Sequence, residues 1–226
     1  MTSKVKLLAF GIAVLIILLS GETYAWQVLD KNSGQNNPIR VACVGDSITC
    51  GTLYPDDLWL MLGPKYLISN FGVNGATIYI HSGNPYVYTP AFKAAKQFEP
   101  QIVIIMLGTN DANPALNESN ADFISEYTLL VTQFQELASK PKVWVAEPPP
   151  IFPNNSGLNG TYLAQNIIPD VQQVAKQTGA DLIDVYTAML GHSTYFSDGV
   201  HPDSDGSAVV ANVTYTAITS AVRPSA

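Results

Sequence analysis

The chain has 226 residues, a hydrophobic fraction of 47%, a charged fraction of 13% and a formal net charge of −7. This length suffices for one sizeable core, and the apolar content excludes a disordered protein. The acidic balance argues against binding to the phosphate backbone of nucleic acids, so no nucleic-acid partner is expected.

The first 25 residues have the pattern of an export signal. Lys4 and Lys6 precede an apolar block over residues 7–19, and small residues such as Gly21 and Ala25 follow it. A basic start, a short apolar block and small residues near a cut site are typical of a signal peptide. The alternative is an uncleaved anchor, although a membrane span needs about 20 apolar residues. Either interpretation predicts a secreted or extracytoplasmic protein, with a membrane contact only if the segment is retained.

Residues 26–38 are polar, which is typical of a linker, and one domain is predicted over residues 39–226. Within it, strand-like apolar runs and helical periodicities alternate about five times. The predicted strands are the run that ends at Gly45-Asp46 and the ranges 66–71, 101–107, 143–146 and 181–185. The main predicted helices are 55–63, 92–98, 121–139, 162–177 and 206–222. Pro169 is expected to kink or divide the fourth of these helices.

This alternation predicts an α/β fold, a three-layer α/β/α sandwich around a mainly parallel five-stranded sheet. Residues 102–106 are all apolar, as expected of a central parallel strand with both faces buried. Ligands of such folds bind outside the carboxyl ends of the strands. Polar residues that follow different strands are therefore expected to meet at one edge of the sheet.

Ser47 is the candidate nucleophile because it directly follows the first predicted strand. A serine hydroxyl is nearly unionised at neutral pH and needs an adjacent base. Asp198-Gly199-Val200-His201, in a loop before the last helix, has a spacing that lets the carboxylate bind one ring nitrogen and turn the other outward. The alternative is an aspartate that caps the last helix beside an incidental histidine. His81 and His192 have no carboxylate close in sequence, and both are interpreted as solvated loop residues.

An acyl-transfer site also needs donors for the negative charge that develops on the carbonyl oxygen. Three candidates follow predicted strands: the N–H groups of Ser47 and Gly75, and the side-chain amide of Asn110. Glycine and asparagine are also common turn residues, so each of them alone has a purely structural interpretation. Their shared position after strands favours the oxyanion hole.

Four segments of the chain resemble the motif blocks of the SGNH (GDSL) hydrolases, and they occur in the order of that family. These segments are Gly45-Asp46-Ser47-Ile48, Asn70-Phe71-Gly72-Val73-Asn74-Gly75, Gly108-Thr109-Asn110-Asp111 and Asp198-Gly199-Val200-His201. The one departure is Ile48 in place of the common leucine, which exchanges one apolar residue for another. The resemblance covers nearly the whole chain from residue 39.

The resemblance implies a flavodoxin-like sheet and a serine esterase that needs no metal or cofactor. In that family the residues matching Ser47, His201 and Asp198 act as nucleophile, base and orienting acid. Those matching Ser47, Gly75 and Asn110 form the oxyanion hole. The catalytic serine is expected to begin a helix, in a fairly open site.

The resemblance is greatest to carbohydrate O-acetylesterases, including sialate O-acetylesterase-like proteins, and rests on residues 70–77 and 89–93. It implies a small-molecule or carbohydrate ester as substrate, and a role for Asp46 and Asp111 in tying loops together. Two alternatives stay open. One is a lipase, lysophospholipase or thioesterase with an apolar groove near Ser47. The other is an inactive carbohydrate-binding or surface protein, which would be favoured by loss of a motif residue.

Aromatic and cysteine residues leave further alternatives open. Tyr79, Tyr86 and Tyr88 are candidate stacking surfaces for sugars, whereas Trp59 is expected to pack against the sheet or other aromatic residues. Export permits a disulfide between the two cysteines, and the alternative is two small buried thiols. Those two residues are Cys43 and Cys50.

Overall fold

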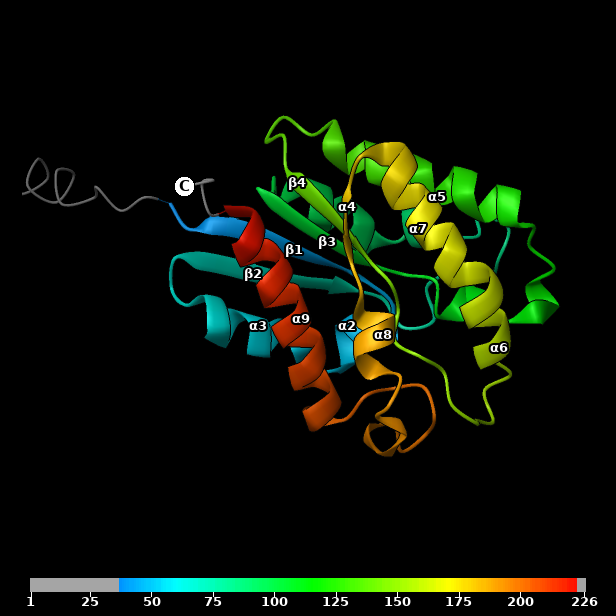
Figure 1. Cartoon of the computed structure of the whole chain (residues 1–226). Helices are drawn as coiled ribbons and strands as arrows, with labels where there is room; N and C mark the ends of the chain where they lie inside the picture. Colours follow the sequence, from blue (N-terminus) through cyan, green and yellow to red (C-terminus); the bar gives the residue numbers. More distant parts are fainter. Residues whose placement is uncertain (1–36, 223–226) are drawn as a thin grey trace, which may run out of the picture. The chain divides into compact units, whose positions relative to one another are not determined.

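The computed structural model describes residues 37–222, so the predicted leader and residues 26–36 of the predicted linker lie outside the described part. From residue 39 onward the chain forms a five-stranded sheet in the order β2-β1-β3-β4-β5, in which every pair of neighbours is parallel (Figure 1). The strands are β1 (Ile39–Gly45), β2 (Tyr66–Gly72), β3 (Ile102–Met106), β4 (Lys142–Ala146) and β5 (Asp181–Ile183). The predicted α/β/α fold is confirmed.

Helices connect the strands in chain order. They are α2 (Ser47–Gly51), α3 (Tyr54–Leu62), α4 (Pro90–Gln97), α5 (Asn120–Gln135), α6 (Gly160–Tyr162), α7 (Ile168–Thr178), α8 (Val185–Met189) and α9 (Ser204–Val222). Short 3₁₀ turns lie at Tyr86–Tyr88, Asn110–Ala112, Pro114–Leu116 and Ser193–Tyr195. None of the helices within residues 37–222 has the length and apolar character that a membrane crossing requires.

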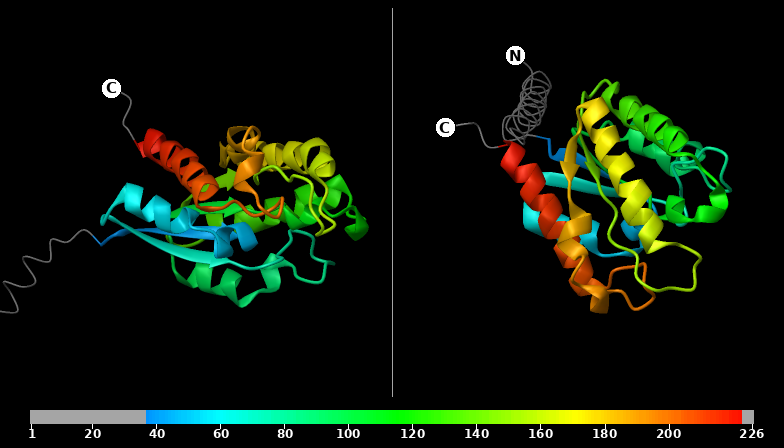
Figure 2. Two further views of the ribbon diagram at one scale, coloured as in Figure 1. Left: turned by 90° about the horizontal axis from the view of Figure 1, so that it is seen from below. Right: turned by 45° about the vertical axis from the view of Figure 1, so that its right-hand side comes forward.

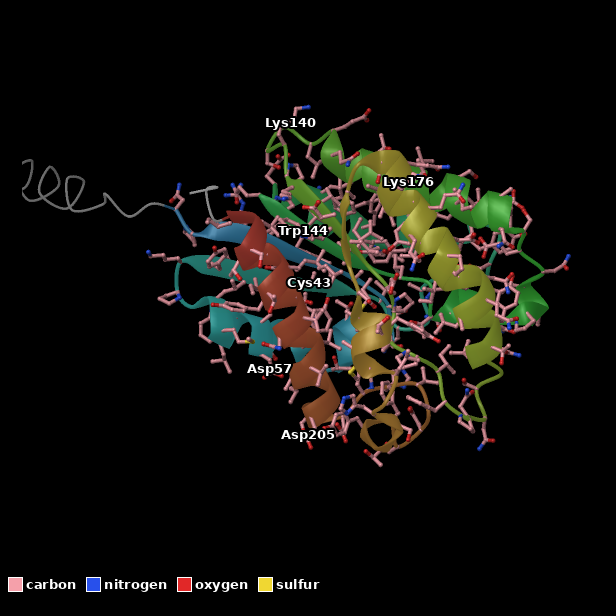
Figure 3. All side chains as sticks on the ribbon, in the orientation of Figure 1. Cys43, Asp57, Lys140, Trp144, Lys176 and Asp205 are labelled. Atoms are coloured by element: carbon pink, nitrogen blue, oxygen red, sulfur yellow. The ribbon has the colours of Figure 1, made fainter. Side chains whose placement is uncertain are left out.

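The three central strands, β1, β3 and β4, bury both of their faces, and consecutive side chains on each strand point to opposite sides of the sheet. On β1, Ala42 and Val44 join a core with α4, α5 and α7, whereas Val41 and Cys43 join a core with α3, α8 and α9. In the left view of Figure 2, α3 and α9 lie above the sheet and α4 lies below it. Side chains in the middle of the sheet, such as Trp144, are enclosed between the layers (Figure 3).

Pro169 changes the helix in which it lies without ending it. The chain passes from α6 through a π-helical turn at Leu163–Ile167 into α7, and the Ile168 N–H donates to the Leu163 carbonyl. Proline cannot donate a hydrogen bond, and its ring clashes with the carbonyl four residues earlier. The predicted kink or division is realised as this wider turn, and Pro169 lies in the first turn of α7.

The strand order shows that the chain changes the side on which it adds strands between β1 and β3. From β1 the chain adds β2 on one side, and it then returns to add β3, β4 and β5 on the other. In open α/β sheets this switch point is where ligands bind, because successive connections diverge there. Ser47 follows β1 and Asn110 follows β3, so both lie at the switch point.

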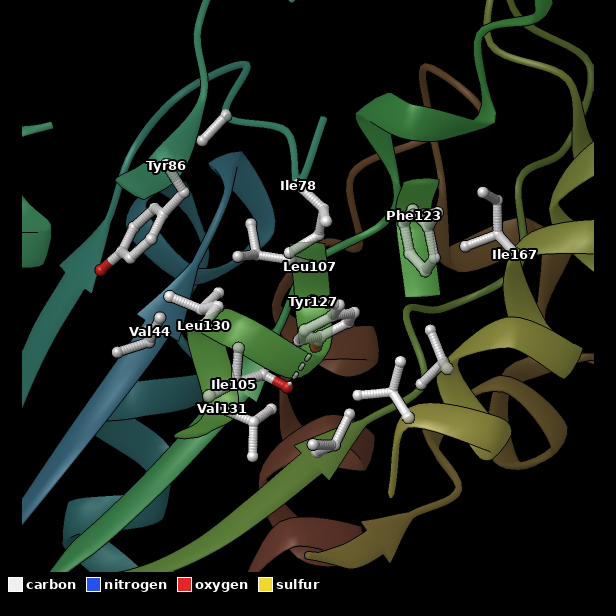
Figure 4. Packing of buried hydrophobic residues seen from close by; sticks show 14 of the residues in the cluster. Val44, Ile78, Tyr86, Ile105, Leu107, Phe123, Tyr127, Leu130, Val131 and Ile167 are labelled. Atoms are coloured by element: carbon white, nitrogen blue, oxygen red, sulfur yellow. Dashed lines mark hydrogen bonds between the residues drawn. The ribbon is translucent and has the colours of Figure 1, made fainter. Parts of the chain in front are cut away.

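Phe134 on α5 tests the contribution of the core to stability. It is fully buried, packs edge-on against Phe92 and lies in the cluster drawn in part in Figure 4. Replacing Phe134 by Ala should lower the free energy of unfolding by about 3–5 kcal/mol, measured by urea unfolding. Leu129 on the same helix is 57% exposed, and its replacement by Ala should change that value by no more than about 0.5 kcal/mol. Equal effects of the two variants would contradict the described packing.

Candidate active site

Ser47 is held by a tight turn between β1 and α2. Asp46 is the N-cap of α2 and accepts a hydrogen bond of 2.9 Å from the N–H of Ile48, so Ser47 is the first residue of the helix. A Cβ atom on Gly45 would lie 2.1 Å from the Thr49 hydroxyl oxygen, so only glycine fits there. The Ser47 Oγ lies 2.8 Å from His201 Nε2. The expected helix start at the serine is present.

The turn of residues 198–201 brings the carboxylate and the imidazole together. Asp198 Oδ2 lies 2.7 Å from His201 Nδ1, and Asp198 Oδ1 accepts hydrogen bonds from the backbone N–H groups of Val200 and His201. Gly199 has a φ of +81°, and a Cβ there would lie 2.4 Å from the Pro153 carbonyl oxygen. The side chains of Ser47, His201 and Asp198 therefore form one continuous hydrogen-bonded chain.

The environment of Asp198 favours its charged form. Burial acts to raise its pKa, but the hydrogen bonds from His201 and Val200 outweigh this effect and lower the pKa to about 2. Asp203, by contrast, accepts hydrogen bonds of 3.0 Å from Asp205 and Gly206 in the first turn of α9. The helix cap is therefore Asp203, and the interpretation of Asp198 as that cap is wrong.

Gly75 and Asn110 lie beside Ser47 in the same pocket. Gly75 has a φ of +70°, a conformation that favours glycine, and Asn110 Nδ2 donates to the Ala76 carbonyl at 2.9 Å. Among the described residues, the N–H groups of Ser47 and Gly75 donate no hydrogen bond within the protein. The three residues predicted to supply donors thus line one pocket, and two of them have backbone N–H groups without an acceptor among the described residues.

Asp46 and Asp111 are fully buried carboxyl groups behind the site. Asp111 accepts hydrogen bonds from the N–H groups of Ile78 and Tyr79, which fixes the loop after Gly75 to the end of β3. Asp46 bonds within its own turn, and its Oδ2 has no hydrogen-bond partner in the described part of the chain. Burial raises the pKa of Asp46 to about 6 and that of Asp111 to about 7.

An open pocket of about 780 Å³ surrounds the Ser47 hydroxyl. Its lining residues are Ser47, Asn74, Gly75, Asn110, Pro153, Asn154, Asn155, Ser156, Leu158, Ser197, Asp198, Val200 and His201. Most of these side chains are amides or hydroxyls. Sequence reasoning missed Asn74 and residues 153–158 as part of the site. The signal that was available is that the 151–160 loop follows β4 at the edge where Ser47 lies.

The predicted aromatic surfaces do not line this pocket. Tyr86 is fully buried and donates its hydroxyl proton to the Phe71 carbonyl, whereas Tyr88 is 68% exposed. Trp59 is 47% exposed, so the expectation that it packs inside is wrong: the neighbouring Leu58 takes the core-facing position on α3.

The other two histidines also lie outside the pocket. His81 contacts Tyr79 edge-on, and His192 stacks on Tyr195 with ring centroids 4.7 Å apart. These contacts fit the interpretation of both histidines as loop residues. Over residues 37–222, no three histidine, cysteine, aspartate or glutamate side chains gather as a metal-binding group.

The two cysteines remain separate thiols. Cys43 is buried within β1, and burial raises the pKa of its thiol to about 12. Cys50 is exposed on α2 and donates a hydrogen bond of 3.1 Å to Asn74 Oδ1. Of the two alternatives, the disulfide is not formed, and only one of the thiols is buried.

Replacing Asp46 by Asn should flatten the dependence of stability on pH between about pH 4 and pH 6. The folded-state pKa is raised from 3.8 to about 6, so the folded protein holds a proton here that the unfolded chain has released. The stability contributed by the neutral carboxyl is complete below pH 3.8 and is lost as the pH rises through 6. Urea unfolding at a series of pH values should show that the free energy of unfolding declines less steeply with pH for Asp46→Asn than for the wild-type protein. An equal slope for the two proteins would contradict the raised pKa of the buried Asp46 carboxyl.

Comparisons with known proteins identify the family to which this chain belongs. The GDSL-like Lipase/Acylhydrolase family model matches residues 43–209. An acetylxylan esterase from Xylanibacter ruminicola is 31% identical over an alignment of 210 positions, which covers 81% of this chain and 44% of that protein. The chain thus spans less than half the length of this relative.

Solved structures share the fold at lower sequence identity. An aryl esterase from M. smegmatis superposes with a TM-score of 0.67 at 20% identity, covering 80% of this chain and 98% of that one. A carbohydrate acetylesterase from Sinorhizobium meliloti gives a TM-score of 0.66 at 20% identity, covering 80% and 99%. The family match extends over more than half of the chain, from the end of β1 into α9. The chain therefore belongs to the GDSL-like Lipase/Acylhydrolase family.

Proposed function

We propose that this protein is a serine esterase that removes short acyl groups, above all acetyl, from a carbohydrate. The observation that carries the proposal is the hydrogen-bonded chain from Ser47 Oγ through His201 to Asp198, at 2.8 Å and 2.7 Å. A nucleophile within reach of a base that is itself oriented by a third group is the arrangement that activates a serine. The alternative of an inactive carbohydrate-binding or surface protein would be favoured by loss of a motif residue, and all four motif segments are complete.

In the first half of the proposed reaction, Ser47 Oγ attacks the acyl carbon and its proton passes to His201 Nε2. Asp198 holds the Nδ1 proton and stabilises the imidazolium that forms. The tetrahedral intermediate then collapses, and His201 gives the proton to the departing alcohol oxygen. The products of this half are the free alcohol and an ester between the acyl group and Ser47.

In the second half, a water molecule attacks the acyl group while His201 Nε2 accepts its proton. His201 then returns that proton to Ser47 Oγ as the ester bond breaks, which releases the carboxylic acid and restores the serine. In both halves the carbonyl oxygen becomes negatively charged. Its proposed donors are the backbone N–H groups of Ser47 and Gly75 and the Asn110 amide, and these three residues line the pocket. One such donor contributes about 2.7–4 kcal/mol to the barrier reduction in a comparable site.

Two observations support a short acyl group on a sugar rather than a lipid. The named relative is an acetylxylan esterase, and one solved structure with this fold is a carbohydrate acetylesterase. The fully apolar side chains that line the pocket are those of Pro153, Leu158 and Val200, and most of the others carry amides or hydroxyls. The lipase alternative required an apolar groove near Ser47.

We propose that the protein acts outside the cytosol. The support is the pattern of the first 25 residues, with a basic start at Lys4 and Lys6 and an apolar block over residues 7–19. Expression of the full chain fused to a reporter active only after export tests this, with Leu→Lys replacements in the apolar block as the control. Export that is unaffected by these replacements would contradict the proposal.

Replacing Asp198 by Asn should lower kcat by roughly 10⁴-fold, because the amide donates to Nδ1 and leaves the imidazole in the wrong tautomer. The measurement is the hydrolysis of p-nitrophenyl acetate near neutral pH. Asp203→Asn is the matched control, because Asp203 lies in the same loop but caps α9. A variant Asp198→Asn that keeps full activity would remove this residue from the mechanism.

Replacing Ser47 by Ala should abolish hydrolysis while leaving the thermal midpoint nearly unchanged, because the side chain is not part of the core. The wild-type protein should cleave p-nitrophenyl acetate faster than the butyrate and octanoate esters, and it should release acetate from acetylated xylan. Rates that rise with acyl chain length would favour the lipase alternative. Activity retained in Ser47→Ala would exclude the serine mechanism.

A further inference from the structure

We propose that Asn74 and the 153–158 loop form a subsite that binds the alcohol part of the ester and selects an uncharged sugar by its hydroxyl groups. The proposal rests on the proposed function, because it concerns the substrate of the same site. The 153–158 loop is the segment from Pro153 to Leu158, which connects β4 to α6. Six residues of this subsite line the pocket that contains Ser47: Asn74, Pro153, Asn154, Asn155, Ser156 and Leu158.

The 153–158 loop is fixed at both ends to the catalytic machinery. The N–H of Phe152 donates to the Gly199 carbonyl at 2.8 Å, which ties the start of the loop to the turn of His201. The N–H of Asn159 donates to the Ala112 carbonyl at 2.9 Å, which ties its end to the turn that begins at Asn110. The loop is therefore a preformed wall, and little ordering entropy is lost when a ligand binds against it.

Asn154 and Asn155 have different roles within this wall. The Asn154 amide donates to the carbonyls of Phe152 and Leu158, and its Oδ1 accepts from the Ser156 N–H at 2.9 Å. Asn154 therefore holds the loop together from inside. The neighbouring Asn155 is exposed, and its amide has no partner among residues 37–222, so it remains available to a ligand.

Asn74 is oriented in the same way by its neighbours. Its Oδ1 accepts the thiol hydrogen of Cys50 at 3.1 Å, and its backbone carbonyl accepts from Asn84 Nδ2 at 2.9 Å. With Oδ1 engaged, the two N–H donors of the Asn74 amide remain for a ligand. The subsite thus offers donors from Asn74 and both donors and an acceptor from Asn155.

The rest of the lining indicates which alcohol fits. Among residues 37–222, no lysine or arginine lines the pocket, and its ionisable side chains there are those of Asp198 and His201, which are paired with each other. A sugar carboxylate would have no cationic partner among these residues, and the formal net charge of −7 opposes it further. No phenylalanine, tyrosine or tryptophan of the described residues lines the pocket, so a sugar ring would be recognised by its hydroxyl edge and not by stacking.

The test compares three acetyl esters: p-nitrophenyl acetate, an O-acetylated methyl xyloside and the matching O-acetylated methyl glucuronide. For Asn155→Ala and Asn74→Ala, kcat/KM for the xyloside should fall by about 3–10-fold relative to p-nitrophenyl acetate, mostly through KM, because each loses about one hydrogen bond. The wild-type protein should prefer the xyloside to the glucuronide. Asn212→Ala, an exposed asparagine on α9, should leave the ratio of the two rates unchanged.

A second variant guards against a structural effect at Asn74. Asn74→Asp keeps the oxygen that accepts the Cys50 thiol but loses the donors, so it should show the same loss as Asn74→Ala with an unchanged thermal midpoint. If the wild-type protein cleaves p-nitrophenyl acetate but no acetylated sugar, the proposed carbohydrate function fails and the subsite fails with it. If it cleaves the xyloside and both alanine variants keep the wild-type ratio of rates, or if it prefers the glucuronide, the subsite alone is overturned.

Discussion

The structure depends on the complete burial of β1 between two parallel neighbours and two layers of helices. From Val41 to Val44 every side chain is buried, and the strand pairs with β2 over its whole length and with β3 over most of it. A shift by one residue would exchange the faces to which the side chains point, so the register is strongly specified. Ser47 follows this strand after a single capping residue, so its position is as well defined as that of the core.

Buried carboxyl groups are the main electrostatic cost of this arrangement. Asp46 and Asp111 lie behind Ser47 and Asn110, where desolvation raises their pKa values to about 6 and 7. Both accept backbone hydrogen bonds in return, and through these bonds they define the turns that carry the site. The site therefore combines buried acids that hold loops with one accessible acid, Asp198, whose pKa is lowered to about 2.

Much of the fold and of the site could be predicted from the sequence because both follow from central strands that are mostly apolar and buried. The residues after β1, β2 and β3 share one edge of the sheet, and for this reason Ser47, Gly75 and Asn110 could be grouped by their positions in the sequence. Asn74 and Asn155 were missed because their roles arise from hydrogen bonds between loops, and such bonds leave no periodic signal. Trp59 was misplaced for a related reason: a short helix buries one stripe, and the sequence alone did not indicate that Leu58 occupies it.

The two hydrogen bonds that end the 153–158 loop have a consequence for how such an enzyme can change. One bond attaches the wall of the pocket to the turn of His201, the proposed general base, and the other attaches it to the turn that begins at Asn110, a proposed oxyanion donor. Under this proposal, an insertion or deletion in the loop would displace both of these groups together with the surface proposed to meet the alcohol. Single side-chain exchanges at Asn155 avoid that displacement. Selectivity for the alcohol can therefore evolve through single substitutions in this wall. A loop taken from another protein would have to form both of these hydrogen bonds again.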